Sequence, residues 1–321
     1  MAGTRIIFMG TPLFAVPTLN ALVEAGHVVT AVVTAPDRPA GRGKKLRTSP
    51  VKDRALELGI PVLQPERLRD PDFLAALDAH AADLYVVVAF RMLPQVVWSR
   101  PRLGTINLHA SLLPDLRGAA PIQWAVMHGY RSTGLTTFLI REEIDTGDVL
   151  LQETLTIGAD ETAGELHDRM MVMGAALVGR TVHALAEGSI EPRQQRPSGQ
   201  ERSAPKLDPE TCRISADMSA ARTHDRIRGL SPAPGAWCML RIGEGPPVHF
   251  KLFRSRHAAH DAGAEAGTLL PVDGRLLLRC SDGWLELLEV QTEGRRRMSA
   301  TELLRGIAGA HRAMPGMRIG D

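Results

Sequence analysis

The sequence predicts an α/β protein with a doubly wound, Rossmann-like N-terminal domain and a smaller β-barrel C-terminal domain. Three observations predict this fold. Short apolar runs alternate with helical stretches in the first half, a Pro-, Gln-, Arg- and Ser-rich segment follows at 191–205, and closely spaced short strands with Gly and Pro turns come after it. We therefore expect one domain at 1–189, a linker at 190–206 and a second domain at 207–321.

The N-terminal half is expected to form a mostly parallel sheet with helices on both faces. Ser49 is a predicted N-cap, and Pro50 suits the first turn of the helix that follows. Ligands bind such sheets beyond the carboxyl ends of the strands. The expected strands are 5–9, 28–34, 61–63, 84–90, 106–109, 135–140 and 149–154, and the expected helices are 11–25, 49–58, 70–80 and 162–187.

The C-terminal part changes character after the predicted linker. One helix is expected near 220–228 and another near 300–307. Between them we expect strands at 236–242, 248–253, 267–270, 276–280 and 284–290. Short strands at this spacing are typical of a small barrel, although their number alone does not select one type of barrel.

Composition narrows the class of protein. The formal net charge of +2 does not indicate a nucleic-acid partner for the whole chain, so only a local basic patch could provide one. The three cysteines have neither metal-site nor disulfide spacing, which fits a reducing cytosol. The apolar run Leu84–Phe90 is too short for a membrane span, and the apolar start is too short for a signal peptide. We expect a cytoplasmic protein, and a monomer, because no long apolar surface stripe demands a partner.

Asn107, His109 and Asp145 are the candidate catalytic residues. Side chains two positions apart on a strand point to the same face, so Asn107 and His109 should project together. An amide beside an imidazole can stabilise the negative charge that develops on an attacked carbonyl oxygen. Asp145 could orient His109 or accept a proton. Either residue of the pair alone would more often be a strand-end cap or a satisfied core histidine, but the pair favours chemistry.

Two glycine-containing segments do not indicate nucleotide binding. Gly10-Thr11-Pro12 follows the first predicted strand, but it has a single glycine, and Pro12 lacks an amide donor. A nicotinamide cofactor is therefore not expected. The segment 41–45 has no glycine at position 38 and no Ser or Thr after Lys44, so it is not a Walker motif.

Several motifs resemble those of enzymes that use 10-formyltetrahydrofolate, and within that family the branch that acts on methionyl-tRNA. The resemblance covers nearly the whole chain. It implies an OB-like C-terminal barrel and formyl transfer from 10-formyltetrahydrofolate, as co-substrate, to the α-amino group of methionyl initiator tRNA, without a metal. The matching segments are 8–12, 36–45, 107–114 (Asn-Leu-His-Ala-Ser-Leu-Leu-Pro), 117–122 (Arg-Gly-Ala-Ala-Pro-Ile), 145–148 (Asp-Thr-Gly-Asp) and 227–236.

The resemblance also implies roles for individual residues. Asn107 and His109 would stabilise the oxyanion, and Asp145 would orient His109 and accept or relay the amine proton. The end of the strand that finishes near Phe90 would supply backbone groups to the pterin ring. Ala89-Phe90-Arg91 departs from the family's usual Ala-Tyr-Gly, so we expect different side chains to line that pocket while the backbone groups still bind the pterin. The implied folate-binding residues are Phe90, Arg91, Met92, Leu93, Ser111, Leu112, Leu113 and Pro114; the last four could instead be a rigid loop that positions the catalytic pair.

A basic patch lies at 37–52. It has six basic residues against one acidic residue, a local net charge of +5. Such a run is often a solvated surface, but it can also bind phosphates with salt-dependent affinity. By resemblance it is the loop that contacts the tRNA acceptor stem. The implied tRNA-binding residues are Arg38, Arg42, Lys44, Lys45 and Arg47.

Two other kinds of function remain open from the sequence. The same site could serve an amino-sugar formyltransferase, a glycinamide ribonucleotide formyltransferase or a formyltetrahydrofolate hydrolase. Alternatively, the chain could be a non-catalytic RNA-binding protein on an enzyme scaffold. The basic patch and the appended barrel favour tRNA as acceptor, and the complete set Asn107, His109 and Asp145 favours an enzyme.

Overall fold

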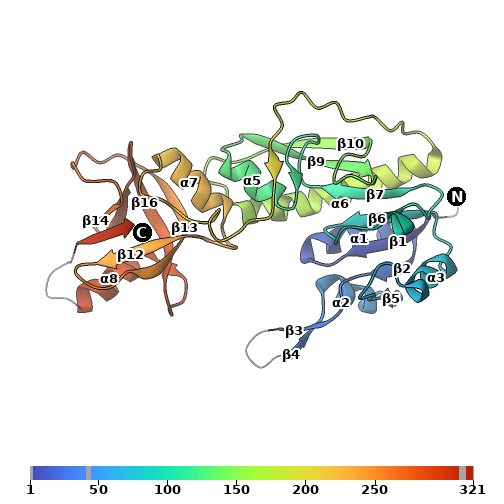
Figure 1. Cartoon of the computed structure of the whole chain (residues 1–321), viewed down its shortest axis with the longest axis horizontal. Helices are drawn as coiled ribbons and strands as arrows, with labels where there is room; N and C mark the ends of the chain where they lie inside the picture. Colours follow the sequence, from blue (N-terminus) through green and yellow to red (C-terminus); the bar gives the residue numbers. More distant parts are fainter. Residues whose placement is uncertain (1–2, 41–44, 311–315, 321) are drawn as a thin grey trace. The chain divides into compact units, whose positions relative to one another are not determined.

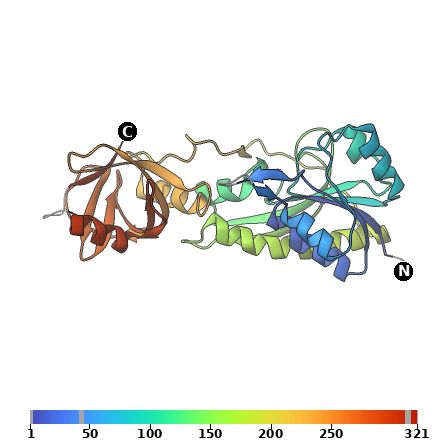
Figure 2. The same cartoon turned by 90° about the horizontal axis from the view of Figure 1, so that it is seen from below.

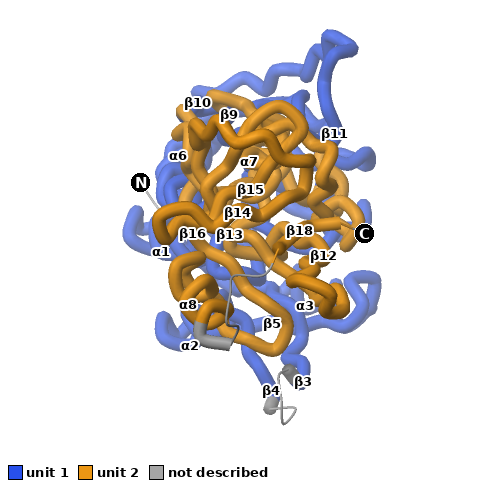
Figure 3. The backbone as a smooth tube through the Cα atoms, turned by 90° about the vertical axis from the view of Figure 1, so that its left-hand side faces the viewer, with its two compact units in different colours: residues 1–118, 133–155, 167–203 blue, residues 119–132, 156–166, 204–321 orange. Residues whose placement is uncertain are grey.

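The computed structural model describes residues 3–40, 45–310 and 316–320. The chain forms two compact units, each built from several segments of the sequence (Figure 3). Unit 1 comprises residues 1–118, 133–155 and 167–203, and unit 2 comprises residues 119–132, 156–166 and 204–321. The chain therefore passes between the units several times before its C-terminal part begins.

The sheet of unit 1 is mostly parallel, as the sequence predicts (Figure 1). Strands β1, β2, β5, β6 and β7 run parallel, and β9 is antiparallel to β7. Because β1 lies in the middle and the chain extends from it first to one side and then to the other, the doubly wound fold is confirmed. In spatial order the described strands are β10 (Val149–Thr156), β9 (Ser132–Leu139), β7 (Thr105–His109), β6 (Leu84–Val88), β1 (Arg5–Gly10), β2 (Val28–Val33) and β5 (Val62–Leu63).

Helices cover both faces of this sheet. On one face, Ile7 and Met9 pack in a cluster with Phe73 and Leu77 of α3. On the opposite face, Gly174 of α6 lies so close to Leu108 of β7 that a Cβ on the glycine would be 2.6 Å from the leucine side chain. The helical elements that begin or lie in unit 1 are η1 (Leu13–Ala15), α1 (Val16–Glu24), α2 (Pro50–Glu57), α3 (Pro71–Ala79) and α4 (Gln95–Trp98); α6 (Ala163–Glu187) continues into it from unit 2.

Local capping explains where two of these helices start. The Ser49 hydroxyl accepts a hydrogen bond from the Lys52 amide (3.1 Å), which confirms the predicted N-cap of α2. The Asp70 carboxylate accepts one from the Asp72 amide (2.9 Å) and caps α3 in the same way. Each side chain satisfies a backbone donor that the first helical turn leaves free.

Unit 2 contains a closed antiparallel barrel. Strand β13 pairs with β12 and also with β16, which closes the sheet. The core is apolar, and α8 (Ala300–Ala310) packs against β15, β16 and β17 (Figure 2, red helix). The described strands are β12 (Ala236–Ile242), β13 (Val248–Ala258), β14 (Thr268–Val272), β15 (Arg275–Arg279), β16 (Trp284–Thr292), β17 (Met298–Ser299) and β18 (Met317–Gly320), and α7 (Ala220–Gly229) precedes them.

Some elements were not predicted. Helix α5 (Pro121–Met127) forms where no helix is expected from the sequence, and β18 completes the barrel between β12 and β14. The basic segment contains a short hairpin of β3 (Arg38–Ala40) and β4 (Lys45–Arg47). Two short strands, β8 (Arg117–Gly118) and β11 (Ser203–Ala204), lie outside the main sheets. None of the described helices is both long and apolar enough to cross a membrane.

Candidate active site

Asn107 and His109 lie on one face of β7, at its carboxyl end. Asn107 is in register with Val87 of β6, and His109 is in register with Thr136 of β9. Residues in register on neighbouring strands point to the same side of a sheet. Val87 belongs to the apolar cluster that includes α3 residues, so the pair projects on that face, opposite to Leu108 and α6. This places both candidates at the sheet edge where ligands are expected.

The imidazole of His109 is held between two oxygen atoms. Its Nε2 lies 2.9 Å from the carbonyl oxygen of Leu116, which can only accept, so Nε2 carries a hydrogen. Its Nδ1 lies 3.6 Å from Oδ2 of Asp145. The side chain is 6% exposed, and the ring of Phe138 packs edge-on against it at a centroid distance of 6.5 Å. The structure thus brings the predicted histidine and carboxylate together.

Asp145 occupies a constrained turn between β9 and β10. Its φ of 56° is in the left-handed region, which few residues other than glycine adopt, although aspartate tolerates it better than most. Its Oδ2 accepts a hydrogen bond from the Gly118 amide (3.0 Å). Gly147, two residues later, has no space for a side chain, because a Cβ would lie 1.6 Å from the Leu139 carbonyl oxygen. The turn therefore fixes the direction in which the carboxylate points.

Asn107 differs from His109 and Asp145 because its side chain makes no hydrogen bond with the described residues. It is partly buried on β7. Among the residues that the structure describes, no hydrogen bond engages its amide group. The site therefore combines a free amide donor with a histidine whose two nitrogens already face acceptors. Such a set can hold a carbonyl oxygen and stabilise negative charge on it.

Gln195 and Arg117 complete the arrangement, and neither is predicted as a site residue from the sequence. The Gln195 side chain is buried (8% exposed) and donates from Nε2 to the carbonyl oxygens of Asp145 and Gly147, each at 2.8 Å. Its Oε1 accepts from Nε (3.2 Å) and Nη2 (2.6 Å) of Arg117. Gln195 comes from the segment interpreted as a linker. The one indication in the sequence was for Arg117, because it opens the segment 117–122, whose motif resembles that of the family.

The loop after His109 is a rigid frame. The Ser111 hydroxyl, almost completely buried, donates to the Asp115 carbonyl oxygen (2.6 Å). The Thr136 hydroxyl donates to the Ser111 carbonyl oxygen (2.7 Å) and accepts from the Leu113 amide (3.1 Å). Leu113 is buried, whereas Leu112 and Pro114 are half-buried. Of the four residues proposed for folate in this loop, Ser111 and Leu113 thus build the frame, and Leu112 and Pro114 remain accessible.

The segment after β6 holds the other four proposed folate-binding residues. Arg91 donates from Nη1 to the Glu66 carbonyl oxygen (2.9 Å) and from Nη2 to that of Pro65, and its guanidinium lies 5.7 Å from the Phe90 ring centroid. Burial, followed by the nearby Arg38 charge, lowers the pKa of Arg91. Met92 is exposed and Leu93 is buried. The unusual Arg91 is therefore tied to the backbone of a neighbouring loop.

The basic hairpin presents two arginines side by side. Arg38 and Arg47 are paired across β3 and β4, and both are exposed. At its base, Lys52 Nζ contacts Asp37 Oδ2 at 2.5 Å, and this hydrogen bond is the main cause that lowers the pKa of Asp37. Arg42 and Lys44 lie outside the described residues, and only the backbone of Lys45 is described. The charge of Lys52 is thus paired with that of Asp37, and Arg38 and Arg47 of the hairpin present the exposed positive charge.

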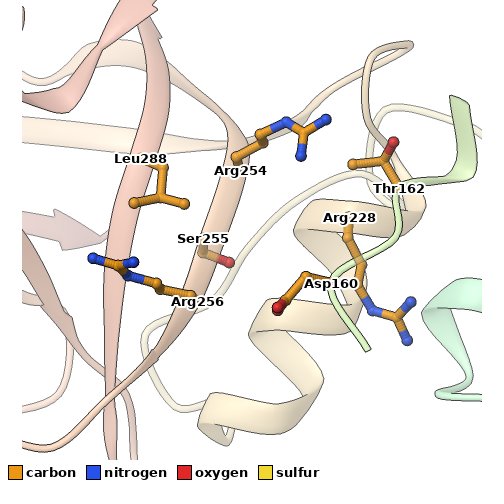
Figure 4. A pocket seen from close by; sticks show the side chains of 7 residues that line it. All are labelled: Asp160, Thr162, Arg228, Arg254, Ser255, Arg256 and Leu288. Carbon is orange, nitrogen blue, oxygen red and sulfur yellow. The ribbon is translucent and has the colours of Figure 1, made fainter. Parts of the chain in front are cut away.

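Unit 2 has a cavity of about 220 Å³ beside α7 and β13 (Figure 4). Its three arginines are already paired with carboxylates: Arg228 with Asp225 (2.7 Å), Arg254 with Glu165 and Arg256 with Glu286 (2.9 Å). The cavity therefore offers little unpaired positive charge to an anion. The residues that line it are Asp160, Thr162, Arg228, Arg254, Ser255, Arg256 and Leu288.

Comparisons with known proteins agree on one family. The family model described as "Formyl transferase" matches residues 4–187, and "Formyl transferase, C-terminal domain" matches residues 206–308. The chain is 48% identical to methionyl-tRNA formyltransferase of Bacteroides fragilis over 307 residues, which is 94% of each chain. It is 47% identical to the protein of the same name from Bacteroides thetaiotaomicron, over 94% of this chain and 95% of that one.

Solved structures share the fold at lower identity. HypX from Aquifex aeolicus, in complex with tetrahydrofolic acid, superposes with a TM-score of 0.63 at 18% identity and covers 94% of this chain. The chain spans about half the length of HypX, since the match covers 47% of it. An N-formyltransferase from Helicobacter canadensis, in complex with folinic acid and dTDP-3-aminofucose, gives a TM-score of 0.62 at 16% identity over 90% of this chain and 99% of that one.

Proposed function

The chain belongs to the formyl transferase family, and we propose that it transfers a formyl group from 10-formyltetrahydrofolate to the α-amino group of methionyl initiator tRNA. The observation that carries the proposal is the amide of Asn107, which no described residue engages in a hydrogen bond, beside the His109–Asp145 pair at the end of β7. Relatives that are 41–48% identical and named methionyl-tRNA formyltransferase support the choice of acceptor.

The reaction is an acyl transfer between two amines. The neutral α-amino group, which titrates near pH ~8, attacks the formyl carbon and forms the new C–N bond. The carbonyl oxygen becomes an oxyanion. The bond between the formyl carbon and N10 then breaks, N10 takes up a proton, and tetrahydrofolate leaves. The α-amino group loses its proton to Asp145, directly or through water.

We propose a different task for each of the three residues. Asn107 would donate a hydrogen bond to the formyl oxygen, because no described residue forms a hydrogen bond with its amide. Protonated His109 would stabilise the oxyanion mainly through its charge, since its nitrogens face Leu116 O and Asp145 Oδ2. Asp145 would hold that charge in place and accept the amine proton. Orientation and preorganised charge are the two main sources of rate in such a reaction.

The folate would lie between two segments at the same edge of the sheet. After β6, Ala89 has a φ of 48°, which turns the backbone of Phe90–Leu93 away from the strand. Backbone groups there would bind the flat pterin ring without requiring particular side chains. The frame of Ser111–Pro114 would form another wall, with Leu112 and Pro114 available for contact.

The basic hairpin would bind tRNA phosphates. Arg38 and Arg47 are exposed and adjacent, and Arg42, Lys44 and Lys45 would add to their charge. Such contacts supply affinity without reading sequence. An amino-sugar acceptor would have no comparable need for the exposed charge of this hairpin.

A choice of acceptors tests the proposal. Purified protein is given 10-formyltetrahydrofolate with methionyl initiator tRNA, with an amino sugar nucleotide, or with no acceptor, and release of tetrahydrofolate is followed. Release that requires the tRNA, together with formyl-methionine on that tRNA, is the expected result. Release with the amino sugar instead, release without acceptor, or no release in any arm would each refute the proposal, and would indicate a sugar formyltransferase, a hydrolase or a binding protein, respectively.

The hairpin can be tested separately through salt dependence. We expect Arg38→Ala and Arg47→Ala each to raise KM for the tRNA severalfold while KM for the folate is unchanged. Each lost phosphate contact should also reduce the slope of log affinity against log salt by about 0.7–0.9. Arg69→Ala, at an exposed arginine elsewhere in unit 1, is the matched control. An unchanged salt slope in both hairpin variants would refute the tRNA-binding role.

A further inference from the structure

The turn that carries Asp145 needs an external restraint. The left-handed φ of Asp145 is strained backbone, which persists only when its surroundings hold it. Among the described residues, the Gly118 amide is the one hydrogen-bond donor to the Asp145 carboxylate, and His109 Nδ1 lies 3.6 Å from the same oxygen. The position of the backbone that carries this side chain must therefore be fixed by other contacts.

Gln195 supplies those contacts from a distant part of the chain. Its amide group uses its full hydrogen-bonding capacity: two donated bonds to the carbonyl oxygens of Asp145 and Gly147, and two accepted bonds from Arg117. Arg117 adjoins Gly118, whose amide binds the Asp145 carboxylate. A closed ring of hydrogen bonds thus links segments 117–118, 145–147 and 195.

The segment that carries Gln195 is itself anchored to unit 1. Arg193 and Val149 exchange two backbone hydrogen bonds, both 2.8 Å long. Further along, the Leu116 amide donates to the Arg202 carbonyl oxygen (2.8 Å). Leu116 is also the residue whose carbonyl oxygen accepts from His109. The supposed linker is therefore packed against both neighbours of the catalytic histidine.

We infer that Gln195 is a positioning residue for the proposed formyl transfer, and that it acts by holding Asp145 against His109. The inference rests on the proposed function. Its hydrogen bonds go to Asp145, Gly147 and Arg117 rather than to a residue proposed to bind folate or tRNA, so its effect on the reaction should pass through Asp145. Its loss should lower kcat and leave KM for the folate and for the tRNA within about twofold of wild type. Misplacement of a catalytic group by about 1 Å can cost about a hundredfold, so we expect kcat to fall about 10- to 100-fold.

Three variants and a double-mutant cycle test the inference. Gln195→Ala removes the side-chain amide. If that variant does not fold, Gln195→Met takes its place in the test, because methionine keeps much of the volume of glutamine but has no N–H group. The neighbouring Gln194 is exposed, so Gln194→Ala is the matched control and should turn over normally. In an Asp145→Asn background, the loss of Gln195 should change the residual kcat by less than about twofold, because residues that act as one unit are not additive.

A second readout does not need turnover. Hydrogen exchange of the Gly118 amide, which donates to Asp145, should be faster in Gln195→Ala and Gln195→Met than in Gln194→Ala. Wild-type kcat in the Gln195 variants, additive losses in the cycle, or unchanged exchange at Gly118 would each overturn the inference. If the wild-type protein does not formylate methionyl-tRNA, the proposed function has failed, and exchange at Gly118 still decides whether Gln195 restrains Asp145.

Discussion

Two buried histidines, one in each unit, look alike at first. His109 in unit 1 bonds through Nε2 to the Leu116 carbonyl oxygen and has Asp145 beside it at 3.6 Å. His224 in unit 2 contacts the Ala159 carbonyl oxygen through Nε2 at 3.2 Å, with an oxygen of Asp160 also at 3.2 Å. Both imidazoles are about 95% buried, so burial and a nearby carboxylate do not separate them.

The carboxylates differ. The Asp160 side chain is 71% exposed, so water and salt screen its charge, whereas that of Asp145 is 13% exposed and fixed by Gly118. His224 also bonds through Nδ1 to the hydroxyl of Ser255, which satisfies it as a core residue. A fixed carboxylate and a free neighbouring donor, Asn107, distinguish the candidate catalytic histidine. His224 instead has the structural role that a lone buried histidine usually has.

The largest expected effect is on activity in unit 1. We expect Asn107→Ala and His109→Ala each to reduce kcat about 100- to 1000-fold, the usual cost of removing one oxyanion-stabilising group. The thermal unfolding midpoint should change little for Asn107→Ala, because its amide makes no hydrogen bond within the described chain. His224→Ala is the control, and its turnover should stay close to wild type at temperatures where it is folded. Near-normal turnover of His109→Ala would remove the distinction between the two histidines.

A smaller effect is expected on stability in unit 2. His224→Ala removes the bonds to Ser255 and Ala159 and leaves a gap beside α7. Unpairing buried groups costs about 1–3 kcal/mol, so denaturant unfolding should show a loss of that size in the free energy of unfolding. His183→Ala, at an exposed histidine, should show a much smaller change. A loss of activity in His224→Ala without a loss of stability would contradict the structural role.

The smallest effect is a pH dependence of that stability. Burial lowers the pKa of His224 from its ordinary 6.5, with Arg228 and His257 acting in the same direction, while the Ala159 carbonyl and Asp160 oppose it. The unfolded chain therefore binds this proton more readily than the folded protein, and stability falls as the pH drops below about 6.5 toward the lower folded pKa. The melting temperature of wild type should thus fall more from pH 7 to pH 5 than that of His224→Gln. Parallel curves would show that His224 does not titrate in this way.

The sequence predicts most clearly what depends on local patterns. The parallel sheet follows from apolar runs that alternate with helical segments, and the shared face of Asn107 and His109 follows from their spacing on a strand. The barrel strand Ala236–Ile242 has the predicted bounds. The choice of Asp145, by contrast, depends on the resemblance of its Asp-Thr-Gly-Asp motif, because Glu142, Glu143 and Asp148 are acidic neighbours in the sequence. The structure brings it beside His109.

Long-range pairing explains what was missed. Strand β18 is four residues long, too short for a pattern of its own, and it exists because β12 and β14 pair with it. Helix α5 is also short, at seven residues. Gln195 lies among polar residues that suggest a linker, and its role depends on carbonyl oxygens 48 and 50 positions earlier in the chain. No local property of a glutamine reveals such contacts.

The hydrogen bonds of Gln195 and Arg202 have a practical consequence for dissecting the protein. A proteolytic or recombinant fragment that stops at residue 189 would omit the residues that support Asp145 and Leu116. A fragment extended through Ser203, where unit 1 ends, would retain them. The polar segment between these two endpoints should therefore decide whether an isolated N-terminal fragment keeps the conformation of the Asp145 turn.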